Sequence, residues 1–465
     1  MTRFAWRQLA LSSLLATALV AADFAPTAVA ETRPQYGGIL HISMRAAPVS
    51  LDPADGAMTD PIGQNNLTLL MFNTLVTLDD HGHVQTSLAA SWRTAPAPRW
   101  FLRLRRGVKF HDGTPLTPEI AAASLRAANP SWIVSSDAES VVIDSGDPEL
   151  LTELALPRNA IAKRNAGKQP GGTGPFYVSD WQLGKKLTLT AEENYWEGRP
   201  FLDGVEIEMG KNYRDQITSL ELARADVIEL APEQTHRAST EGRRIVSSPP
   251  IELLVLVFAR PVQTPADKSL RDALALSVDR GSIRNVLLQG AGQPAASILP
   301  NWMSGYGFVF SSEADLSRAR QAREQVRALS TWSVGYDSTD PIARVIAERV
   351  ALNARDAGLS LQPTPLQSTS NLTTDLRLVR IPLSSSDPWI ALVGAAATSG
   401  LSIPKTVGGV DALYAAEQTL LATQQIIPLF HLPVAYAASS AVKNWTVQPD
   451  GSLSLTDVRL ENGRP

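Results

Sequence analysis

The pattern of the sequence changes at Pro249-Pro250, and this change limits the possible folds most strongly. After it comes an apolar run from Leu253 to Phe258, which is typical of a strand buried on both faces. Helical patterns then cover residues 269–288, 312–328, 341–357 and 410–425, and strand patterns cover residues 332–336 and 376–381. Strands that alternate with helices in this way predict an α/β domain built from βαβ-like units.

Before the two prolines, short alternating segments prevail, which is typical of a sheet. Residues 39–42 alternate, and residues 100–110 predict a pair of strands around a turn at Arg106-Gly107. Further alternating strands are predicted at residues 187–190 and 205–209. We expect all of these strands to belong to the sheet of the first half.

A helix is predicted to begin after Thr117, because a hydroxyl at the N-cap is followed by Pro118, Glu119 and an alanine-rich stretch. Residues 129–175 show little periodicity and end in a cluster of glycine and proline, which predicts an irregular loop. The tail at residues 451–460 is strand-like and matches the first half better than the second. We therefore expect the chain to return to the first domain.

The chain has 465 residues, and single hydrophobic cores stop growing near about 250 to 300 residues, so at least two domains are expected. Hydrophobic residues make up 44% and charged residues 19% of the chain, which excludes a disordered tail or a series of membrane spans. The formal net charge of -4 carries no electrostatic footprint for nucleic acid or for an anionic membrane surface.

The first thirty residues have the features of a secretory signal peptide. Arg3 and Arg7 precede an apolar run over residues 9–22, and the small-x-small triplet Ala28-Val29-Ala30 predicts cleavage before Glu31. The apolar run is shorter than the roughly 20 residues that a spanning helix needs. Cleavage would remove Arg3, Arg7 and Asp23, which moves the formal net charge from -4 to -5.

The chain contains no cysteine, so the exported protein would rely on packing without disulfides. A lipid-modified cysteine at the end of the signal peptide is also excluded. This combination favours a free protein in the periplasm of a diderm bacterium over a membrane-tethered lipoprotein.

No pattern of metal ligands stands out. His81-Gly82-His83 is the one close pair of histidines, but Asp79 and Asp80 before it give the segment the composition of a hairpin turn. Zinc or copper would need several converging ligands, and the other histidines are scattered. We expect neither a metal site nor a cofactor.

Catalytic patterns are equally weak. A Gly-x-Ser-x-Gly elbow is missing from the sequence, and a thiol nucleophile is impossible without cysteine. Gly172-Thr173-Gly174 and Gly290-Ala291-Gly292 lack the lysine of a phosphate loop and the spacing of a dinucleotide motif, so turns explain them better. A catalytic triad assembled from distant residues stays open at this point.

Several blocks of the chain resemble family 5 of the bacterial extracellular solute-binding proteins, which includes receptors for dipeptides, oligopeptides and nickel. They occur in the order of the family over nearly the whole chain after residue 30 and identify the architecture. The blocks are Gly37-Gly38-Ile39-Leu40, Leu51-Asp52-Pro53, Leu88-Ala89-Ala90-Ser91-Trp92, residues 104–117, Gly172-Thr173-Gly174-Pro175-Phe176, Asn194-Tyr195-Trp196, residues 270–280 and Ile427-Pro428-Leu429-Phe430-His431.

The resemblance implies an α/β periplasmic-binding-protein fold of type II, with two lobes that close around a ligand like a Venus flytrap. Lobe I would comprise residues 31–250 and 428–465, and lobe II residues 251–427, with two crossing segments as the hinge. Hinge closure would convert occupancy into a shape that the permease of an ABC importer recognises, and this needs no catalytic group. We expect a monomer whose partners are a small-molecule or peptide ligand and that permease.

Two departures from the family pattern bear on the ligand. Peptide-binding members usually keep an aspartate, three residues before an Asp-Pro pair, which holds the amino terminus of the ligand. Here Asp387-Pro388 is present, but Ser384 occupies that position, so a zwitterionic peptide is disfavoured because its ammonium would be buried without a partner. The segment between Arg126 and Gly172 is also shorter than in most members of the family, which predicts a reduced subdomain on lobe I.

Where the family places its cleft, aromatic and small polar residues become the candidate ligand-binding residues. We favour Trp302 and Trp389, because aromatic side chains beside small polar ones suit an uncharged or weakly polar ligand. The full set is Met58, Thr59, Glu252, Trp302, Tyr306, Ser384, Ser385, Ser386, Trp389, Phe430 and His431.

Three other functions remain alternatives to the importer receptor. A sensor or scaffold would bind a ligand but pass the signal to a partner other than a permease. An exported hydrolase would need a nucleophile in the cleft. A transcription factor would need a DNA-binding head, and the signal peptide argues against it.

Overall fold

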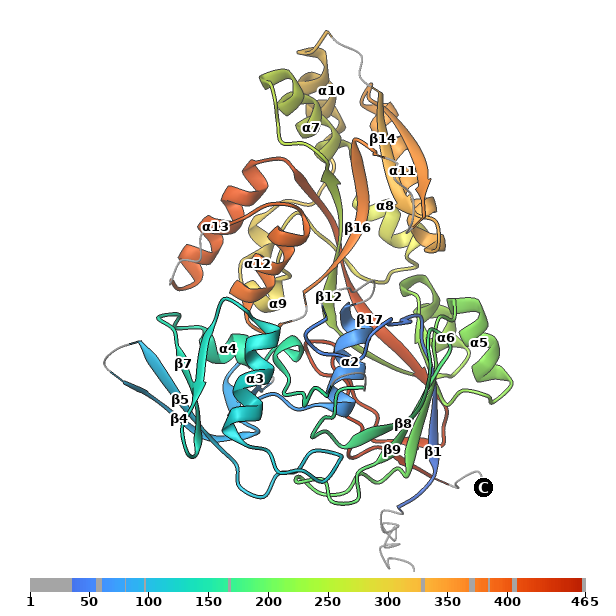
Figure 1. The fold of residues 1–465 in the computed structure, drawn as a ribbon. Coiled ribbons are helices and arrows are strands. Elements are labelled where there is room, and N and C mark those ends of the chain that lie inside the picture. The colour runs from blue at the N-terminus through green and yellow to red at the C-terminus, as the bar shows by residue number, and fades with distance from the viewer. Residues whose placement is uncertain are drawn as a thin grey trace, which may run out of the picture. The chain divides into compact units, whose positions relative to one another are not determined.

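One large sheet forms the backbone of the fold in the computed structural model, which describes residues 36–55, 61–79, 81–95, 98–165, 169–327, 331–367, 373–383, 385–403 and 408–461. Its strands follow the order β15-β14-β16-β12-β17-β11-β1-β10-β9-β8, and β13 pairs with β17 (Figure 1). The strands are β1 (Ile39–Ser43), β8 (Phe176–Gln182), β9 (Lys186–Ala191), β10 (Gly204–Glu208), β11 (Val227–Leu230), β12 (Arg244–Phe258), β13 (Gln293–Pro294), β14 (Thr331–Asp337), β15 (Ser360–Leu366), β16 (Leu376–Pro382) and β17 (Ile426–Ala438).

Two long strands join the halves of this sheet. β12 and β17 pair with one another over most of their lengths, and the register shifts on both sides of Pro250. A proline cannot donate a ladder hydrogen bond, which explains why the pairing is irregular at this point. We call the elements packed around β1 lobe I and those packed on β12 beyond Pro250 lobe II.

In lobe II, the apolar run of β12 is buried on both faces, as the sequence predicts. Leu253 and Val255 pack in a cluster with α12 (Pro388–Thr398) and α13 (Val410–Ala422). Leu254 and Leu256 face the opposite way, into a cluster with α7 (Pro265–Ser277) and α11 (Pro341–Asp356). Because side chains alternate along a strand, the continuous run fills two hydrophobic layers, and Figure 1 shows α12 and α11 on opposite sides of β16.

The predicted helices of lobe II exist, but their bounds differ. The pattern at residues 269–288 breaks after Ser277 because Asp279 accepts a hydrogen bond from Ser282 N and caps a new short helix. That new segment comprises α8 (Arg280–Ser282) and a π-helical turn at Ile283–Leu287. The helix predicted at residues 312–328 is α10 (Leu316–Glu324). Short α9 (Asn301–Ser304), α12 and strand β15 were not predicted.

A second sheet in lobe I contradicts two predictions. Its order is β4-β5-β7-β6, so the strands before residue 108 do not all join one sheet. The segment 129–175, predicted as a loop, contains β6, β7 and α4; their apolar runs are too short to show a period, yet they pack in one cluster. The elements of this subdomain are β4 (Ala89–Ala95), β5 (Arg99–Leu104), α3 (Pro118–Ala128), β6 (Ile133–Ser136), β7 (Ser140–Asp144) and α4 (Leu150–Leu154).

The helix start at Thr117 is confirmed, because its side chain accepts a hydrogen bond from Ile120 N. The predicted strand pair over residues 100–110 is wrong in its second half. Residues after the Arg106-Gly107 turn form a further turn, in which Phe110 N donates to Thr114 O, instead of a strand. Strands β9 and β10 confirm the alternation at residues 187–190 and 205–209.

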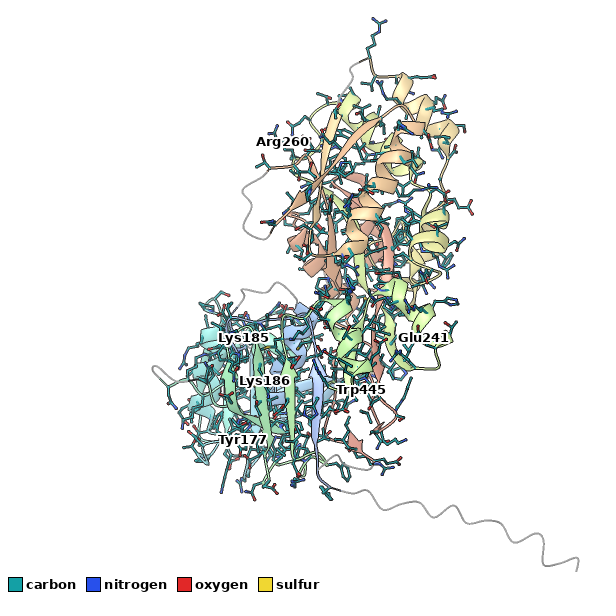
Figure 2. All side chains as sticks on the ribbon, turned by 90° about the vertical axis from the view of Figure 1, so that its right-hand side faces the viewer. Tyr177, Lys185, Lys186, Glu241, Arg260 and Trp445 are labelled. Carbon is teal, nitrogen blue, oxygen red and sulfur yellow. The ribbon has the colours of Figure 1, made fainter. Side chains whose placement is uncertain are left out.

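The C-terminal segment packs against lobe I. Trp445 and Val458 are buried in the same cluster as Leu40 of β1, and Figure 2 labels Trp445 beside the strands of this lobe. Only β19 (Arg459–Leu460) is a strand within the predicted strand-like tail, and it pairs with β18 (Val442–Lys443).

The other elements of lobe I are α2 (Pro61–Met71), the hairpin of β2 (Val76–Leu78) and β3 (Val84–Thr86), α5 (Tyr213–Glu221) and α6 (Thr235–Thr240). Within the described ranges, every helix is too short or too polar to cross a membrane. The predicted signal peptide lies outside the described residues.

Candidate ligand-binding site at the edge between the lobes

The topology makes the carboxyl ends of the parallel strands in each lobe face the other lobe. In lobe I, β1 runs parallel to β10 and β11, and β11 is antiparallel to β17. In lobe II, β14, β15 and β16 are parallel, and β16 is antiparallel to β12. Since β12 leads into lobe II and β17 leads back, both sets of carboxyl ends point to the junction. Ligands of α/β sheets bind at such ends, so this junction is the candidate site.

Arg380, near the end of β16, is the central charged group of lobe II at this junction. Its Nε lies 2.9 Å from Asp340 Oδ2, and its Nη1 lies 3.3 Å from Glu252 Oε2. Burial lowers the pKa of Arg380, but Asp340 and Glu252 outweigh that effect and raise it above its ordinary value. Its Nη2 is buried and has no hydrogen-bond partner among the described residues. The guanidinium is therefore held in place with one donor unused.

On the lobe I side, a second charged group lies after β1. The Arg45 guanidinium lies 4.6 Å from the centre of the Tyr213 ring, and its Nε lies 3.7 Å from Glu229 Oε2. Glu229 also accepts a hydrogen bond from Gln216 Nε2 at 3.1 Å. Burial raises the pKa of Tyr213, while Arg45 and then Arg380 lower it, so the field of lobe II reaches this ring.

Glu233 follows β11 in lobe I, and its Oε2 is buried without a hydrogen-bond partner in the part of the chain that the structure describes. Burial raises the pKa of this carboxyl, a hydrogen bond from its own backbone N–H lowers it, Asp340 raises it, and Arg380 lowers it. An acceptor of lobe I and a donor of lobe II are thus both unsatisfied at the same junction.

Among the residues that the sequence suggested, Glu252 lies directly in this junction through its contact with Arg380. Trp302 is 39% exposed, and its Nε1 donates to the carbonyl oxygen of Pro250 at 2.9 Å. This bond ties α9 to the irregular point of β12. Trp302 therefore borders the segment that joins the lobes.

Ser385 and Ser386 lie between β16 and α12, and Trp389 lies in the first turn of α12. Ser385 is buried, and its Oγ accepts from Asp387 N. Ser386 lies next to Gly82, the tip of the β2–β3 hairpin of lobe I, where an added Cβ would be 3.8 Å from the Ser386 carbonyl oxygen. Trp389 Nε1 donates to Gly408 O, within lobe II.

Three other suggested residues lie beside the part of β12 that follows Pro250. Phe430 is completely buried in a hydrophobic cluster. The Tyr306 hydroxyl donates to Glu417 Oε2 at 2.7 Å, and His431 Nε2 lies 3.0 Å from Ile298 O. His431 also lines a pocket of about 440 Å³ formed by residues 293–297 and 307–313 with Asn301. Met58, Thr59 and Ser384 fall outside the described residues.

His81 and His83 lie in the hairpin that the sequence predicts. The Asp79 carboxylate accepts hydrogen bonds from the backbone N–H groups of both histidines, which lowers the pKa of Asp79 to about 2. The described residues contain no group of three or more His, Asp or Glu side chains that could hold a metal ion.

Sequence reasoning missed most of the charged and polar groups at the junction: Arg45, Tyr213, Glu233, Asp340 and Arg380. A usable signal was present for some of them, because Arg45 closely follows the predicted strand at residues 39–42, and Arg380 ends another. Side chains just beyond strand ends are the ones that parallel sheets gather at one edge.

The fold is that of the two-lobed periplasmic binding proteins. NikA from Staphylococcus aureus in complex with Ni(L-His)2 superposes with a TM-score of 0.77 at 18% identity, covering 91% of this chain and 100% of that one. DppA from Helicobacter pylori in complex with the peptide STSA gives a TM-score of 0.77 at 18% identity, covering 92% of this chain and 99% of that one. Such low identity establishes the fold alone.

The family model of bacterial extracellular solute-binding proteins, family 5 (Middle) matches residues 83–392, and the chain belongs to this family. The nickel-binding protein NikA of Staphylococcus aureus is 26% identical over 241 residues, which are 48% of this chain and 49% of NikA. The oligopeptide-binding protein AppA of Bacillus subtilis is 25% identical over 303 residues, or 57% of this chain and 54% of AppA. The chain thus spans about half the length of these curated relatives. The family resemblance of the sequence is confirmed.

Proposed function

We propose that this protein is a periplasmic receptor that captures a small ligand between its two lobes and delivers it to an ABC-type importer. The observation that carries the proposal is that the carboxyl ends of the parallel strands of both lobes point to one junction. At this junction Arg380 has a buried donor that is unused among the described residues. A buried donor without a partner costs about 1 to 3 kcal/mol, so a partner supplied by a ligand would recover that energy.

Capture would follow from closure of the lobes. In this proposal the hinge consists of the two strands that join the lobes, β12 near Pro250 and β17 between Pro428 and Pro433, the residue that pairs with Pro250. Lobe I comprises residues 31–250 and 428–465, and lobe II residues 251–427. The bond from Trp302 to Pro250 would change as the hinge moves, so the tryptophan would report closure by its fluorescence.

The protein would reach the periplasm through the signal peptide at residues 1–30, and without a cysteine it would remain free of a lipid anchor. A monomer with no catalytic role is sufficient for this function, because the permease reads the closed shape. The names of the relatives support this assignment: one is a nickel-binding and another an oligopeptide-binding protein.

The candidate contacts to the ligand are Glu252, Arg380, Trp302, Ser385, Ser386 and Trp389, together with Met58, Thr59 and Ser384. Tyr306, Phe430 and His431 are buried, and in this proposal they support the site from behind. Ser384 stands where peptide-binding members usually keep an aspartate, so an ammonium group of a ligand would need another anionic partner in this site.

The test is a thermal-shift screen of residues 31–465 against peptides, amino acids, amines, sugars, nickel complexes and haem. A ligand at 100 times its Kd stabilises by about 2.7 kcal/mol, which shifts Tm by a few degrees. Arg380→Gln should remove the shift of the ligand found. Arg260→Gln is the matched control, because Arg260 is exposed beyond the far end of β12 (Figure 2) and should leave it unchanged.

Turnover of a bound compound, with a nucleophile that can be trapped covalently, would instead establish an exported hydrolase. A shift that survives Arg380→Gln would place the ligand away from the junction.

A further inference from the structure

Two buried atoms at the junction have no hydrogen-bond partner among the described residues, and one is an acceptor while the other is a donor. Glu233 Oε2 in lobe I needs a donor, and Arg380 Nη2 in lobe II needs an acceptor. Leaving either one unpaired in a buried place costs free energy, and the cost is greater for charged groups. The same ligand could relieve both, provided that it carries a donor and an acceptor.

The charge of the surroundings decides which donor and which acceptor fit. Arg380 is one guanidinium among three carboxylates, since Asp340 and Glu252 contact it and Glu233 lies within its electrostatic reach. Because the carboxylates outnumber the cation, an anionic group of a ligand at Arg380 would be repelled by the carboxylates around it. Like charges repel one another more strongly in a partly buried site than in water.

The basic side chains described next, also near the junction, do not reverse this excess of negative charge. Lys211 Nζ lies 3.3 Å from Glu208 Oε2, and Arg45 is engaged with Glu229 and Tyr213. Lys185, labelled in Figure 2, is exposed on the turn between β8 and β9, where solvent and salt screen its charge.

We propose that the junction selects a compact organic cation, whose nitrogen donates to Glu233 and whose uncharged carbonyl or hydroxyl oxygen accepts from Arg380 Nη2. The inference rests on the proposed function and adds the charge class of the ligand. Asp340 and Glu252 act as positioning residues, because they hold the guanidinium so that only Nη2 is left to bind. A carboxylate in the same place is disfavoured by the carboxylates already there.

The test uses one scaffold in four charge states. Leucinamide is a cation with a neutral amide, leucine a zwitterion, N-acetyl-leucine an anion and N-acetyl-leucinamide neutral; glycyl-leucine in the same four forms gives a longer set. Binding of each to residues 31–465 is measured by calorimetry. We expect the cationic amide of at least one set to bind at least about 10-fold more tightly than its anionic form, as one charge-assisted hydrogen bond implies.

Two variants assign the preference to its residues. Glu233→Gln should weaken the cationic form about 10- to 100-fold and the neutral form less than about 3-fold, because a neutral amide still offers an acceptor. Arg380→Lys keeps the positive charge but loses the fixed fork, so it should weaken both forms. It also serves as the folded alternative if Arg380→Gln does not fold.

Three outcomes would overturn the inference. The anionic form could bind as tightly as the cation, or Glu233→Gln could weaken the cationic and neutral forms equally. The two groups could also pair with one another in the ligand-free protein, in which case the Tm changes of Glu233→Gln and Arg380→Gln would not add in the double variant. Failure of every form, and of every compound in the wider screen, would instead overturn the proposed function, and this inference with it.

Discussion

Burial raises the pKa of both Glu417 and Glu233, but the regions around these two glutamates differ in the hydrogen bonds that they offer. Inside lobe II, Glu417 Oε1 accepts from the backbone N–H groups of Ile298 and Leu299, and Oε2 accepts from the Tyr306 hydroxyl. At the junction, Glu233 Oε2 has no such donor within the described ranges. The first glutamate is satisfied by its own lobe, and the second is not.

This difference in hydrogen bonding indicates a structural role for Glu417 and a binding role for Glu233. Glu417 fixes the loop that carries Trp302 and Tyr306 by joining it to α13, so its hydrogen bonds are part of the fold. In the described part of the chain, Glu233 makes no comparable hydrogen bond through Oε2, so the fold does not account for the burial of this atom. Loss of the first should therefore lower stability, and loss of the second should lower binding.

The largest effect is expected from Glu417→Ala. This change leaves two backbone N–H groups and one hydroxyl without their acceptor, and each buried orphan costs about 1 to 3 kcal/mol. We expect the free energy of unfolding of lobe II to fall by about 3 kcal/mol or more in urea titrations. Glu324→Ala on the surface of the same lobe is the control and should change it by less than about 0.5 kcal/mol. Equal losses in both variants would contradict a structural role for Glu417.

The next effect is a pH dependence of stability caused by His431. Its Nε2 lies 3.0 Å from the carbonyl oxygen of Ile298, and the backbone N–H of Ile298 donates to Glu417. Burial lowers the pKa of His431 to about 4, against 6.5 when it is unfolded. The unfolded chain therefore binds more protons between these values, and stability falls as the pH drops from 6.5 to 4. The loss is at most about 3 kcal/mol.

His431→Gln should flatten this pH dependence, measured as the difference in unfolding free energy between pH 6.5 and pH 4.5. The raised pKa of Glu417 acts in the opposite direction, since a carboxyl that prefers its proton in the folded state stabilises the fold as the pH falls. An unchanged slope in His431→Gln would show that other groups cause the acid sensitivity.

A smaller effect is expected from Asp340→Ala, which should change both stability and ligand binding. Asp340 caps α11 by accepting from Ile342 N, and it holds Arg380 Nε at 2.9 Å. The cap is worth about 1 kcal/mol, and loss of the ion pair adds to it. Asp387→Ala, which removes only the cap of α12, is the matched control. Asp340→Ala should destabilise more than Asp387→Ala and also weaken ligand binding.

The smallest effect on stability is expected from Glu233→Gln. Burial raises the pKa of Glu233, so ionisation at neutral pH opposes folding, and the neutral amide removes that cost. We expect this variant to be as stable as the unchanged protein, within about 0.5 kcal/mol at pH 7, and slightly more stable at higher pH. A loss comparable to that of Glu417→Ala would mean that Glu233 is part of the fold.

The sequence by itself determined the family, the doubly buried strand at Leu253–Phe258 and the helix after Thr117, because these depend on residues close together along the chain. Short strands such as β6 and β7 escaped prediction, because four or five residues are too few to show a period. Their place was decided by packing against α3 and β5.

Only the tertiary structure decided the site. Arg380 and Glu233 are ordinary charged residues in the sequence, and nothing near either of them predicts the other. They come together because strand order and direction carry the carboxyl ends of β11 and β16 to one junction. Whether a buried atom keeps an unused hydrogen bond depends on what the rest of the chain brings beside it, and no local pattern records that.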